Sequence, residues 1–223
     1  MRVVVFASGG GSNFRALTDR FADGGEGVEV AGLVASRETA GAIRRAEKAG
    51  IPWVVASAAG AGAEGRGGGE GAFLTGALER LGADLVVLAG YLRLVPPEVV
   101  GGWWGRIINI HPALLPAFGG RGMYGGRVHE AVIASGVRVT GATVHFVDEA
   151  YDRGPIIAQW PVPVLDGDTP TSIGARVLEV EHELLPRVVA ALADGTVSLD
   201  EDGRVRWSRP WIDGHRFRVD REA

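Results

Sequence analysis

Hydrophobic residues along the chain form short unbroken runs that alternate with stretches of helical periodicity. Unbroken runs are typical of parallel strands, because such strands are covered on both faces. The predicted strands are Arg2–Ala7, Val28–Ala35, Ile51–Ala56, Asp84–Ala89 and Arg106–Ile110. The predicted helices between the first three strands are Ser12–Phe21 and Thr39–Ala49. This alternation predicts a parallel sheet with right-handed crossovers.

The second half of the chain has a different pattern. Val137–Val147 and Pro155–Val164 are extended segments joined by a short stretch, so they can pair antiparallel. Thr171–Leu192 is a predicted long helix in which a proline, Pro186, can introduce a bend. The glycine-rich segments Ser57–Ala72 and Pro112–Gly126 are predicted loops. Together these patterns predict an α/β fold: a Rossmann-like open twisted sheet, mostly parallel, with helices on both faces and an antiparallel C-terminal portion.

Length and composition limit the domain organisation and the chemistry. A chain of 223 residues fits one larger α/β domain, which we place over residues 1–195, followed by a C-terminal extension or tail over residues 196–223. With 46% hydrophobic and 22% charged residues, the chain can bury a sizeable core. The absence of cysteine excludes disulfides, thiolate metal sites and thiol nucleophiles.

Charge and hydropathy also bear on partners and location. The formal net charge of -4 shows no basic excess, so nucleic acid is not an expected partner. The apolar run at the N-terminus is too short for a signal-peptide core, and Leu85–Leu92 is too short to span a bilayer. We therefore predict a cytoplasmic protein that acts on small molecules without a membrane partner, as a monomer or a homodimer.

A glycine-rich loop, Ser8–Asn13, joins the first strand to the first helix. Such a junction directs free backbone N–H groups and the positive helix end at an anion, and Ser12 or Asn13 can cap the helix. The dinucleotide fingerprint does not fit, because Phe14 stands where its third glycine belongs, and no P-loop lysine follows. The loop therefore favours a phosphate monoester as ligand, with a plain tight turn as the alternative.

Asn109 and His111 lie two residues apart at the end of a predicted strand, so their side chains face the same side. In open α/β sheets, ligands bind beyond the carboxyl ends of the strands. An amide beside an imidazole can stabilise a developing oxyanion, and the imidazole can also move protons. The alternative is a strand-end histidine whose ring is bonded to the backbone.

The turn between the two antiparallel segments carries three acidic residues. Asp148 and Glu149 are ordinary solvated turn residues on their local pattern. Asp152 comes just before Gly154-Pro155, where a loop carboxylate could be directed at His111. A carboxylate beside an imidazole favours its protonated form. The sequence leaves open whether the two side chains meet.

Five segments together resemble the folate-dependent formyltransferases and, within that group, the phosphoribosylglycinamide formyltransferase family. They are Ser8–Asn13, Val87–Arg93, Asn109–Pro116, Thr143–Val147 and Asp152–Ile156, and the similarity runs from Arg2 to about Leu192. The Asn109 segment with the later Asp152 is specific to the group as a whole. The Gly-Ser-Asn loop and the modest length indicate the family. One departure is Phe118-Gly119-Gly120, where the family often has Phe-Pro-Gly.

The resemblance implies the formyltransferase fold. It also implies an enzyme that transfers a formyl group from the co-substrate 10-formyltetrahydrofolate to the amine of 5-phosphoribosylglycinamide. This reaction would need no metal ion. It implies three catalytic residues: Asn109, His111 and Asp152. For the phosphoribosylglycinamide it implies Gly11, Ser12 and Asn13 at the phosphate and Glu181 at the ribose hydroxyls. For the folate it implies Arg66, Leu92, Arg93, Leu94, Val95, Asn109, Asp148, Glu149, Ala150, Tyr151 and Asp152.

The spacing of the last predicted helix supports the role of Glu181. This residue falls on an apolar stripe formed by Ile173, Val177, Leu184 and Val188, and a carboxylate on such a stripe needs a partner. The alternative is that the rotation of the helix leaves Glu181 at a solvated edge.

In the implied mechanism, Asn109 and the imidazolium of His111 stabilise a tetrahedral oxyanion, while Asp152 keeps His111 charged and assists proton transfer. Three other functions remain open. A formyltetrahydrofolate hydrolase would have no use for a phosphate loop. A methionyl-tRNA formyltransferase usually has a further C-terminal domain, for which Val197–Ala223 is too short. A non-catalytic nucleotide-binding sensor would not need the three catalytic residues together.

Overall fold

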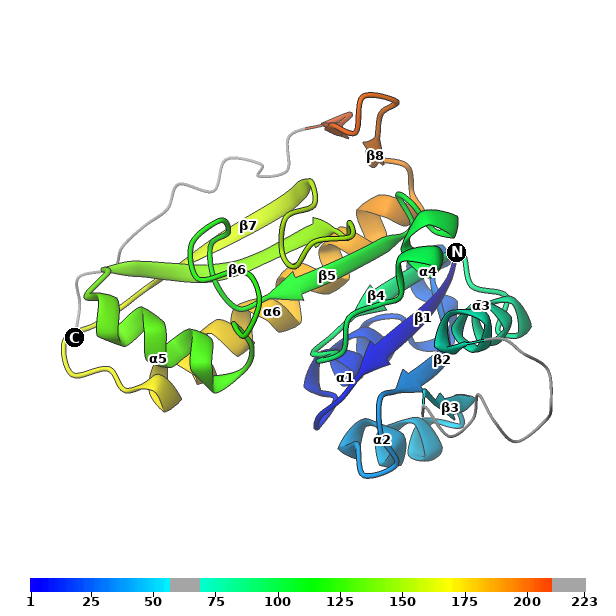
Figure 1. Cartoon of the computed structure of the whole chain (residues 1–223), viewed down its shortest axis with the longest axis horizontal. Helices are drawn as coiled ribbons and strands as arrows, with labels where there is room; N and C mark the ends of the chain where they lie inside the picture. The colour runs from blue at the N-terminus through cyan, green and yellow to red at the C-terminus, as the bar shows by residue number, and fades with distance from the viewer. Residues whose placement is uncertain (57–68, 210–223) are drawn as a thin grey trace.

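A seven-stranded sheet forms the centre of the molecule (Figure 1). The computed structural model describes residues 1–56 and 69–209. The strand order is β3-β2-β1-β4-β5-β6-β7, in which β1 to β5 pair in parallel and β6 and β7 each pair antiparallel with the preceding strand. The strands are β1 Arg2–Ala7, β2 Glu29–Ala35, β3 Trp53–Val55, β4 Leu85–Leu88, β5 Ile107–His111, β6 Val139–Phe146 and β7 Ile156–Pro163. The predicted fold class is confirmed.

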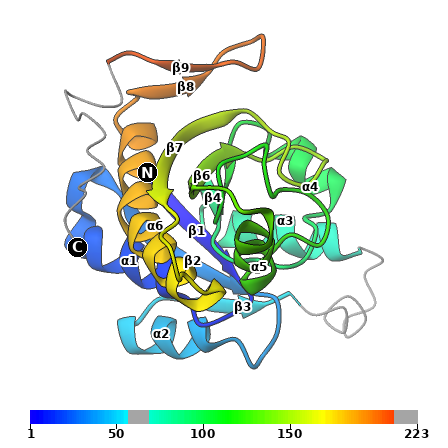
Figure 2. The same cartoon turned by 90° about the vertical axis from the view of Figure 1, so that its left-hand side faces the viewer.

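Helices cover both faces of the sheet (Figure 2). The core on one face contains side chains of α1 (Ser12–Arg20), α2 (Gly41–Ala49) and α6 (Pro170–Ala193). The core on the other face contains side chains of α3 (Glu70–Arg80) and α4 (Pro97–Gly102). A short 3-10 helix, η1 (Ala22–Gly27), follows α1, and α5 (Gly126–Ser135) packs against α6.

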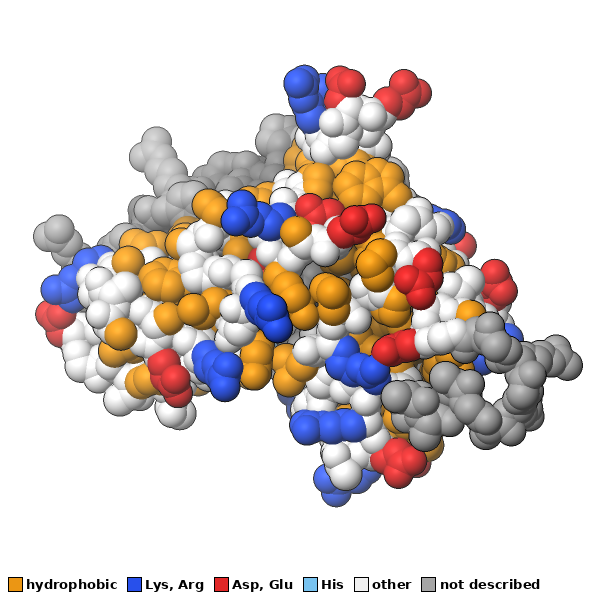
Figure 3. All heavy atoms as spheres, viewed as in Figure 1, with side chains coloured by type: hydrophobic (Ala, Val, Ile, Leu, Met, Phe, Trp, Pro, Cys, Tyr) orange, Lys and Arg blue, Asp and Glu red, His pale blue; other side chains and the backbone are white. Residues whose placement is uncertain are grey.

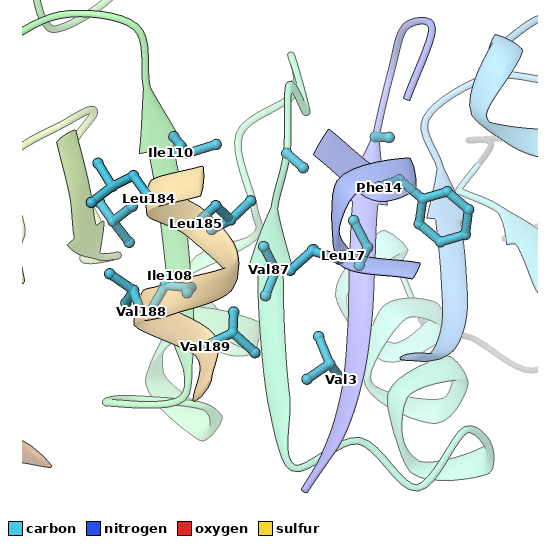
Figure 4. Packing of buried hydrophobic residues seen from close by; sticks show 14 of the residues in the cluster. Val3, Phe14, Leu17, Val87, Ile108, Ile110, Leu184, Leu185, Val188 and Val189 are labelled. Carbon is cyan, nitrogen blue, oxygen red and sulfur yellow. The ribbon is translucent and has the colours of Figure 1, made fainter. Parts of the chain in front are cut away.

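Alternation along β1 shows how one strand serves both cores. Val3 and Val5 belong to the core beneath α1 and α6, whereas Val4 and Phe6 belong to the core beneath α3 and α4. Figure 4 shows the first core, where α6 lies against β5 and β4. Its labelled residues are Val3, Phe14, Leu17, Val87, Ile108, Ile110, Leu184, Leu185, Val188 and Val189. This packing fixes α1 and α6 relative to the carboxyl ends of the strands, where the strand order reverses between β1 and β4.

After α6 the chain forms a separate antiparallel hairpin, β8 (Val197–Leu199) and β9 (Val205–Trp207). The Trp207 indole N–H donates to the Ile157 carbonyl of β7 at 3.1 Å, so the hairpin is attached to the outer strand of the main sheet. This hairpin lies in the segment predicted as a C-terminal extension or tail. The rest of the predicted extension, residues 210–223, lies outside the described residues.

The helix predictions differ from the structure in two respects. The loop predicted to reach Ala72 ends earlier, because α3 begins at Glu70. Helices α3, α4 and α5 were not predicted. Helix α6 runs as one element from Pro170 to Ala193 and includes Pro186 without a break.

Two further features concern the charge of the surface and the hydrophobicity of the helices. Basic and acidic side chains both occur across the face seen in Figure 3. Among the described residues, no helix is long and apolar enough to cross a membrane.

Candidate active site

A cavity of about 630 Å³ lies at the carboxyl ends of β1, β4 and β5. It gathers residues from the loop before α1, the segment after β4, the end of β5, the turn after β6 and the helix α6. The predicted site residues on its wall are Gly11, Ser12, Asn13, Leu92, Arg93, Leu94, Val95, Asn109, His111, Asp148, Ala150, Tyr151, Asp152 and Glu181. Glu149 is exposed and does not line this cavity, and Arg66 lies outside the described residues.

The glycine loop ends at the N-terminus of α1. Gly11 is the N-cap residue and has φ of 72°, a left-handed conformation that favours glycine. Within the described structure no side chain caps this helix, so the prediction that Ser12 or Asn13 caps it was wrong. The first N–H groups of α1 are therefore left without a capping side chain beside the cavity, as an anion-binding helix end requires.

Two arginines that sequence reasoning missed contact the glycine loop from the neighbouring segment. Arg37 Nε donates to the Ser8 carbonyl at 3.0 Å, and Arg45 Nε of α2 donates to the Gly10 carbonyl at 2.7 Å. Both guanidinium groups bring positive charge next to the N-terminus of α1. Only the three-dimensional fold reveals them, because α1 and β2 separate them from the loop in sequence.

Asn13 and Glu181 form a buried pair that links α1 to α6. Asn13 Nδ2 donates to Glu181 Oε2 at 2.7 Å, and the two residues are 7% and 6% exposed. Burial raises the pKa of Glu181 to about 7, and the hydrogen bond from Asn13 opposes this shift. The apolar stripe predicted for this helix is buried as expected, so the alternative of a solvated Glu181 is excluded.

Asn109 is held by a histidine on the adjacent antiparallel strand. His145 lies opposite Asn109 in the β5–β6 register, and its Nε2 is 3.1 Å from Asn109 Nδ2. The other ring nitrogen, Nδ1, is 2.7 Å from the Phe146 carbonyl, which can only accept, so Nδ1 carries the hydrogen. Nε2 then accepts from the Asn109 amide. The second N–H of that amide is only weakly engaged, since Asp152 Oδ1 is 3.5 Å away.

His111 and Asp152 meet, as predicted. His111 Nδ1 is 3.6 Å from Asp152 Oδ2, and both side chains are largely buried. His111 Nε2 is 2.8 Å from the Phe118 carbonyl, so this nitrogen carries a hydrogen. In the neutral ring, Nδ1 is therefore an acceptor that faces a carboxylate. A proton added at Nδ1 would turn this contact into a hydrogen-bonded ion pair.

The protonation of this pair differs from the expected imidazolium. Burial lowers the pKa of His111 below its usual value, although Asp152 and the Phe118 carbonyl act in the opposite direction. Burial acts to raise the pKa of Asp152, but the rings of His145 and His111 and the Gly120 N–H together hold it below its usual value. The free protein at neutral pH thus carries an ionised Asp152 beside a neutral His111.

The turn after β6 brings Asp152 back to these rings. A side chain at Gly154 would place its Cβ 1.9 Å from the Phe146 carbonyl oxygen, so only glycine allows this close approach. Asp152 itself has φ of 55°, a conformation that Asp and Asn tolerate better than most residues. The Gly120 N–H donates to Asp152 Oδ2 at 2.8 Å and ties the turn to the loop after β5.

The segment after β4 forms the opposite wall. The Leu92 N–H donates to Ser8 Oγ at 2.8 Å, which ties this segment to the start of the glycine loop. Leu92 and Leu94 are exposed hydrophobic residues on the cavity wall. Arg93 turns to Glu70 of α3, with Nη2 to Oε2 at 2.5 Å, so its side chain contributes to structure as well as to the wall.

Sequence reasoning also missed two histidines on the cavity wall. His145 is 2% exposed, and the signal for it was the one ionisable residue of the strand Val139–Phe146. His129 of α5 also lines the cavity, and its pKa is lowered by burial and by the nearby His111.

Comparisons with known proteins agree on one family. The formyl transferase family matches residues 1–189. The chain is 45% identical over 202 residues to "Phosphoribosylglycinamide formyltransferase, chloroplastic" of Arabidopsis thaliana, covering 91% of this chain and 68% of that protein. It is 37% identical over 206 residues to "Trifunctional purine biosynthetic protein adenosine-3" of Homo sapiens, covering 92% of this chain and 20% of that protein. The chain thus spans only part of each of these relatives.

A solved structure has the same architecture. Glycinamide ribonucleotide transformylase 1 from Symbiobacterium toebii superposes with a TM-score of 0.83 at 37% sequence identity, and the match covers 93% of each chain. The similarity therefore extends over the sheet, the helices and the cavity described above.

Proposed function

Because the chain belongs to the formyl transferase family, we propose that it is the enzyme that transfers the formyl group of 10-formyltetrahydrofolate to the amine of 5-phosphoribosylglycinamide in purine biosynthesis. The names of the plant and human relatives support this substrate and this pathway. The main domain at residues 1–195 and a cytoplasmic location stay predictions, and the plant relative is named as chloroplastic.

One observation carries the proposal: a single cavity joins an anion-binding helix end to a proton-transfer site. The uncapped N-terminus of α1 lies at one end, with Arg45 beside it. His111 and Asp152 lie at the other end of the same wall. A phosphorylated sugar that carries an amine fits this division, because its phosphate and its nucleophile are separated by the ribose.

The catalytic residues act on the tetrahedral intermediate. The substrate amine attacks the formyl carbon, a C–N bond forms, and the formyl oxygen becomes an oxyanion. The second N–H of the Asn109 amide, weakly engaged in the free protein, donates to this oxygen. His145 holds the amide in that orientation by accepting from its other N–H.

Proton transfer uses the ionised Asp152 and the neutral His111. The attacking amine must lose a proton and the leaving folate nitrogen must gain one before the old C–N bond breaks. Asp152 accepts the amine proton and passes it to His111 Nδ1, 3.6 Å away, so that Asp152 is ionised again and stabilises the imidazolium. The imidazolium of His111 then returns this proton, through Asp152, to the leaving folate nitrogen. The old C–N bond breaks, and both residues regain their starting charges.

The folate is proposed to bind between the Leu92–Val95 segment and the Asp148–Asp152 turn. Exposed Leu92 and Leu94 supply apolar contact area, and Tyr151 lines the same cavity. Backbone groups of the turn supply polar contacts. A flat ring with polar edges suits such a site.

The experiment mixes the protein with 10-formyltetrahydrofolate and glycinamide ribonucleotide and follows the folate absorbance. The expected result is a fast conversion that requires both substrates and gives one formylated product per folate. Formate release without glycinamide ribonucleotide would identify a hydrolase instead. Binding of both ligands without conversion would identify a sensor. Asp152→Asn is the matched control, because it preserves the size and the backbone conformation of the turn.

A further inference from the structure

The loop after β5 contains a turn, Phe118–Gly120, that contacts both members of the proton-transfer pair. The Phe118 carbonyl accepts a hydrogen bond from His111 Nε2 at 2.8 Å. The Gly120 N–H donates to Asp152 Oδ2, also at 2.8 Å. Both contacts come from backbone groups that lie two residues apart. One turn therefore holds the two side chains between which the proton moves.

The conformation of this turn is unfavourable for its own residues. Phe118 has φ of 55°, a left-handed conformation that costs free energy for any residue with a Cβ. Gly120 has φ of 97°, a value that glycine adopts much more readily than other residues. Hydrogen bonds to charged groups are among the strongest in proteins, so the bond to Asp152 helps to offset this cost.

The segment before the turn is anchored to the two antiparallel strands. The Leu115 N–H donates to Thr143 Oγ1 of β6 at 3.0 Å. Gln159 Nε2 of β7 donates to the Leu115 carbonyl at 2.8 Å. Because these bonds do not involve His111 or Asp152, the turn has a support of its own and can hold both side chains in place.

Gly119, in the middle of the turn, lies close to Asp152. A Cβ at this position would be 3.2 Å from Asp152 Cβ and 2.5 Å from Leu115 Cδ2. This is the position at which the sequence departs from the family pattern, since a glycine stands where proline is frequent. The missing side chain lets the turn lie against the residue that carries the carboxylate.

The two contacts act on different steps of proton transfer. A carbonyl can only accept, so Phe118 keeps a hydrogen on His111 Nε2 and leaves Nδ1 to take the proton from Asp152. A backbone N–H can only donate, so Gly120 favours the ionised form of Asp152. Loss of one contact should therefore affect mainly one of the two groups.

We propose that the Phe118–Gly120 turn is a positioning element for the reaction: the Phe118 carbonyl keeps His111 Nδ1 directed at Asp152, and the Gly120 N–H keeps Asp152 available as a carboxylate. Both groups act through these side chains. The role in turnover rests on the proposed function, whereas the effect on the protonation of the free protein does not.

The test weakens each contact without changing a side chain, by replacing one peptide bond with an ester. Glycolic acid in place of Gly119 turns the Phe118 carbonyl into an ester carbonyl, which is a weaker acceptor. Glycolic acid in place of Gly120 removes the N–H that donates to Asp152. Glycolic acid in place of Gly122 is the control, because in the described structure neither atom group that it changes, the Arg121 carbonyl or the Gly122 N–H, has a hydrogen-bond partner.

We expect the esters at positions 119 and 120 each to lower kcat about tenfold, with little change in KM for either substrate. The two pKa values should move in opposite directions. The ester at 119 should lower the pKa of His111, because the Phe118 carbonyl acts to raise it. The ester at 120 should raise the pKa of Asp152, because the Gly120 N–H acts to lower it. NMR titrations of the free protein measure both, and the ester at 122 should match the unaltered protein.

Two results would overturn the proposal: kcat and both pKa values that equal those of the ester at 122, or the same loss of kcat in all three esters. If the esters at 119 and 120 do not fold, as judged by thermal melting, Gly119→Ala takes their place, because its Cβ would displace Asp152. Its control is Gly101→Ala, where no atom lies within 4 Å of the added Cβ.

Gly119→Ala should lower kcat, lower the pKa of His111 and raise the pKa of Asp152, and unchanged values would contradict the proposal. Failure of the proposed function is a separate result. The unaltered protein would then transfer no formyl group to phosphoribosylglycinamide, and the two pKa shifts alone would test the turn.

Discussion

The two ends of the cavity are built by different means. At the glycine-loop end, the groups that face the ligand are backbone N–H groups at the start of α1, placed by the parallel strands and by the left-handed Gly11. At the Asp152 end, they are side chains held between two antiparallel strands and a turn. The first end depends mainly on backbone geometry, whereas the second depends on protonation, which burial controls. Substitutions at the two ends should therefore alter different kinetic constants.

The largest expected effect lies at the antiparallel end. Asp152→Asn should lower kcat about 1,000-fold, because the carboxylate that accepts and stabilises the proton is lost. The KM for phosphoribosylglycinamide should change little. Because Asp152 acts to raise the pKa of His111, the same variant should lower that pKa further. Steady-state kinetics and an NMR titration of His111 measure both effects, and a raised His111 pKa would contradict the pairing.

At the glycine-loop end, the largest effect should be on folding. A Cβ at Gly11 would lie 2.7 Å from Ala42 Cβ, and the left-handed φ adds strain. Gly11→Val should therefore lower the free energy of unfolding by about 3 kcal/mol. No atom lies within 4 Å of a Cβ at Gly10, so Gly10→Ala should fold normally.

Gly10→Ala therefore isolates binding from folding. It should weaken binding of phosphoribosylglycinamide and leave folate binding unchanged, because Gly10 lines only the phosphate end. Chemical denaturation and calorimetric titration with each ligand separate the two variants. Equal free energies of unfolding for Gly11→Val and Gly10→Ala would contradict this prediction, because Ala42 would then move away from the added side chain at little cost.

Glu181 tests the comparison between the two ends of the cavity further, because it is an ionisable side chain at the glycine-loop end. Its pKa is raised from 4.5 to about 7, so the folded protein binds this proton more tightly than the unfolded chain. That stabilisation is complete below pH 4.5 and is lost as the pH rises through about 7. At pH 8 the buried carboxylate therefore costs about 3 kcal/mol, since one pKa unit is worth about 1.4 kcal/mol.

Glu181→Gln should accordingly raise the melting temperature more at pH 8 than at pH 5.5. It should also raise the KM for phosphoribosylglycinamide, because an ionised acceptor for the sugar hydroxyls is lost. Thermal melting at the two pH values tests the first effect. A melting temperature that rises equally at both values would contradict the assigned protonation.

The smallest effect on binding should come from the arginine beside the loop. Arg45→Gln should raise the KM for phosphoribosylglycinamide about threefold, because a partly exposed cation contributes modestly to holding a phosphate. The effect should shrink as salt is added. Lys48→Gln, an exposed residue of the same helix that does not line the cavity, serves as the control. An effect as large as that of Gly10→Ala would mean that charge dominates this end.

Sequence reasoning succeeded where one local pattern determines the structure. The unbroken apolar runs predicted β1, β2 and β4 closely, and the apolar stripe of α6 correctly marked Glu181 as buried. Asn109 and His111 follow from their place at a strand end. Helices α3, α4 and α5 were missed, and α4 is difficult to recognise because it has only six residues and ends in two glycines.

What the sequence could not provide depends on contacts between distant segments. His145 faces Asn109 only because of the β5–β6 register, which no local pattern specifies. Arg45 meets Gly10 only because α2 packs beside the loop. The neutral state of His111 follows from burial, which outweighs the carboxylate beside it. A sequence shows the carboxylate but not the degree of burial.

The most direct test of the division between the two ends is a calorimetric titration of His111→Asn with phosphoribosylglycinamide. His111 is bonded to the Phe118 carbonyl and paired with Asp152, and among the described residues no hydrogen bond or ion pair joins it to the start of α1. We predict a Kd within about threefold of that of the unaltered protein, while kcat falls by about 100-fold or more. A Kd weakened in proportion to kcat would contradict the account, because binding and chemistry would then depend on the same end of the cavity.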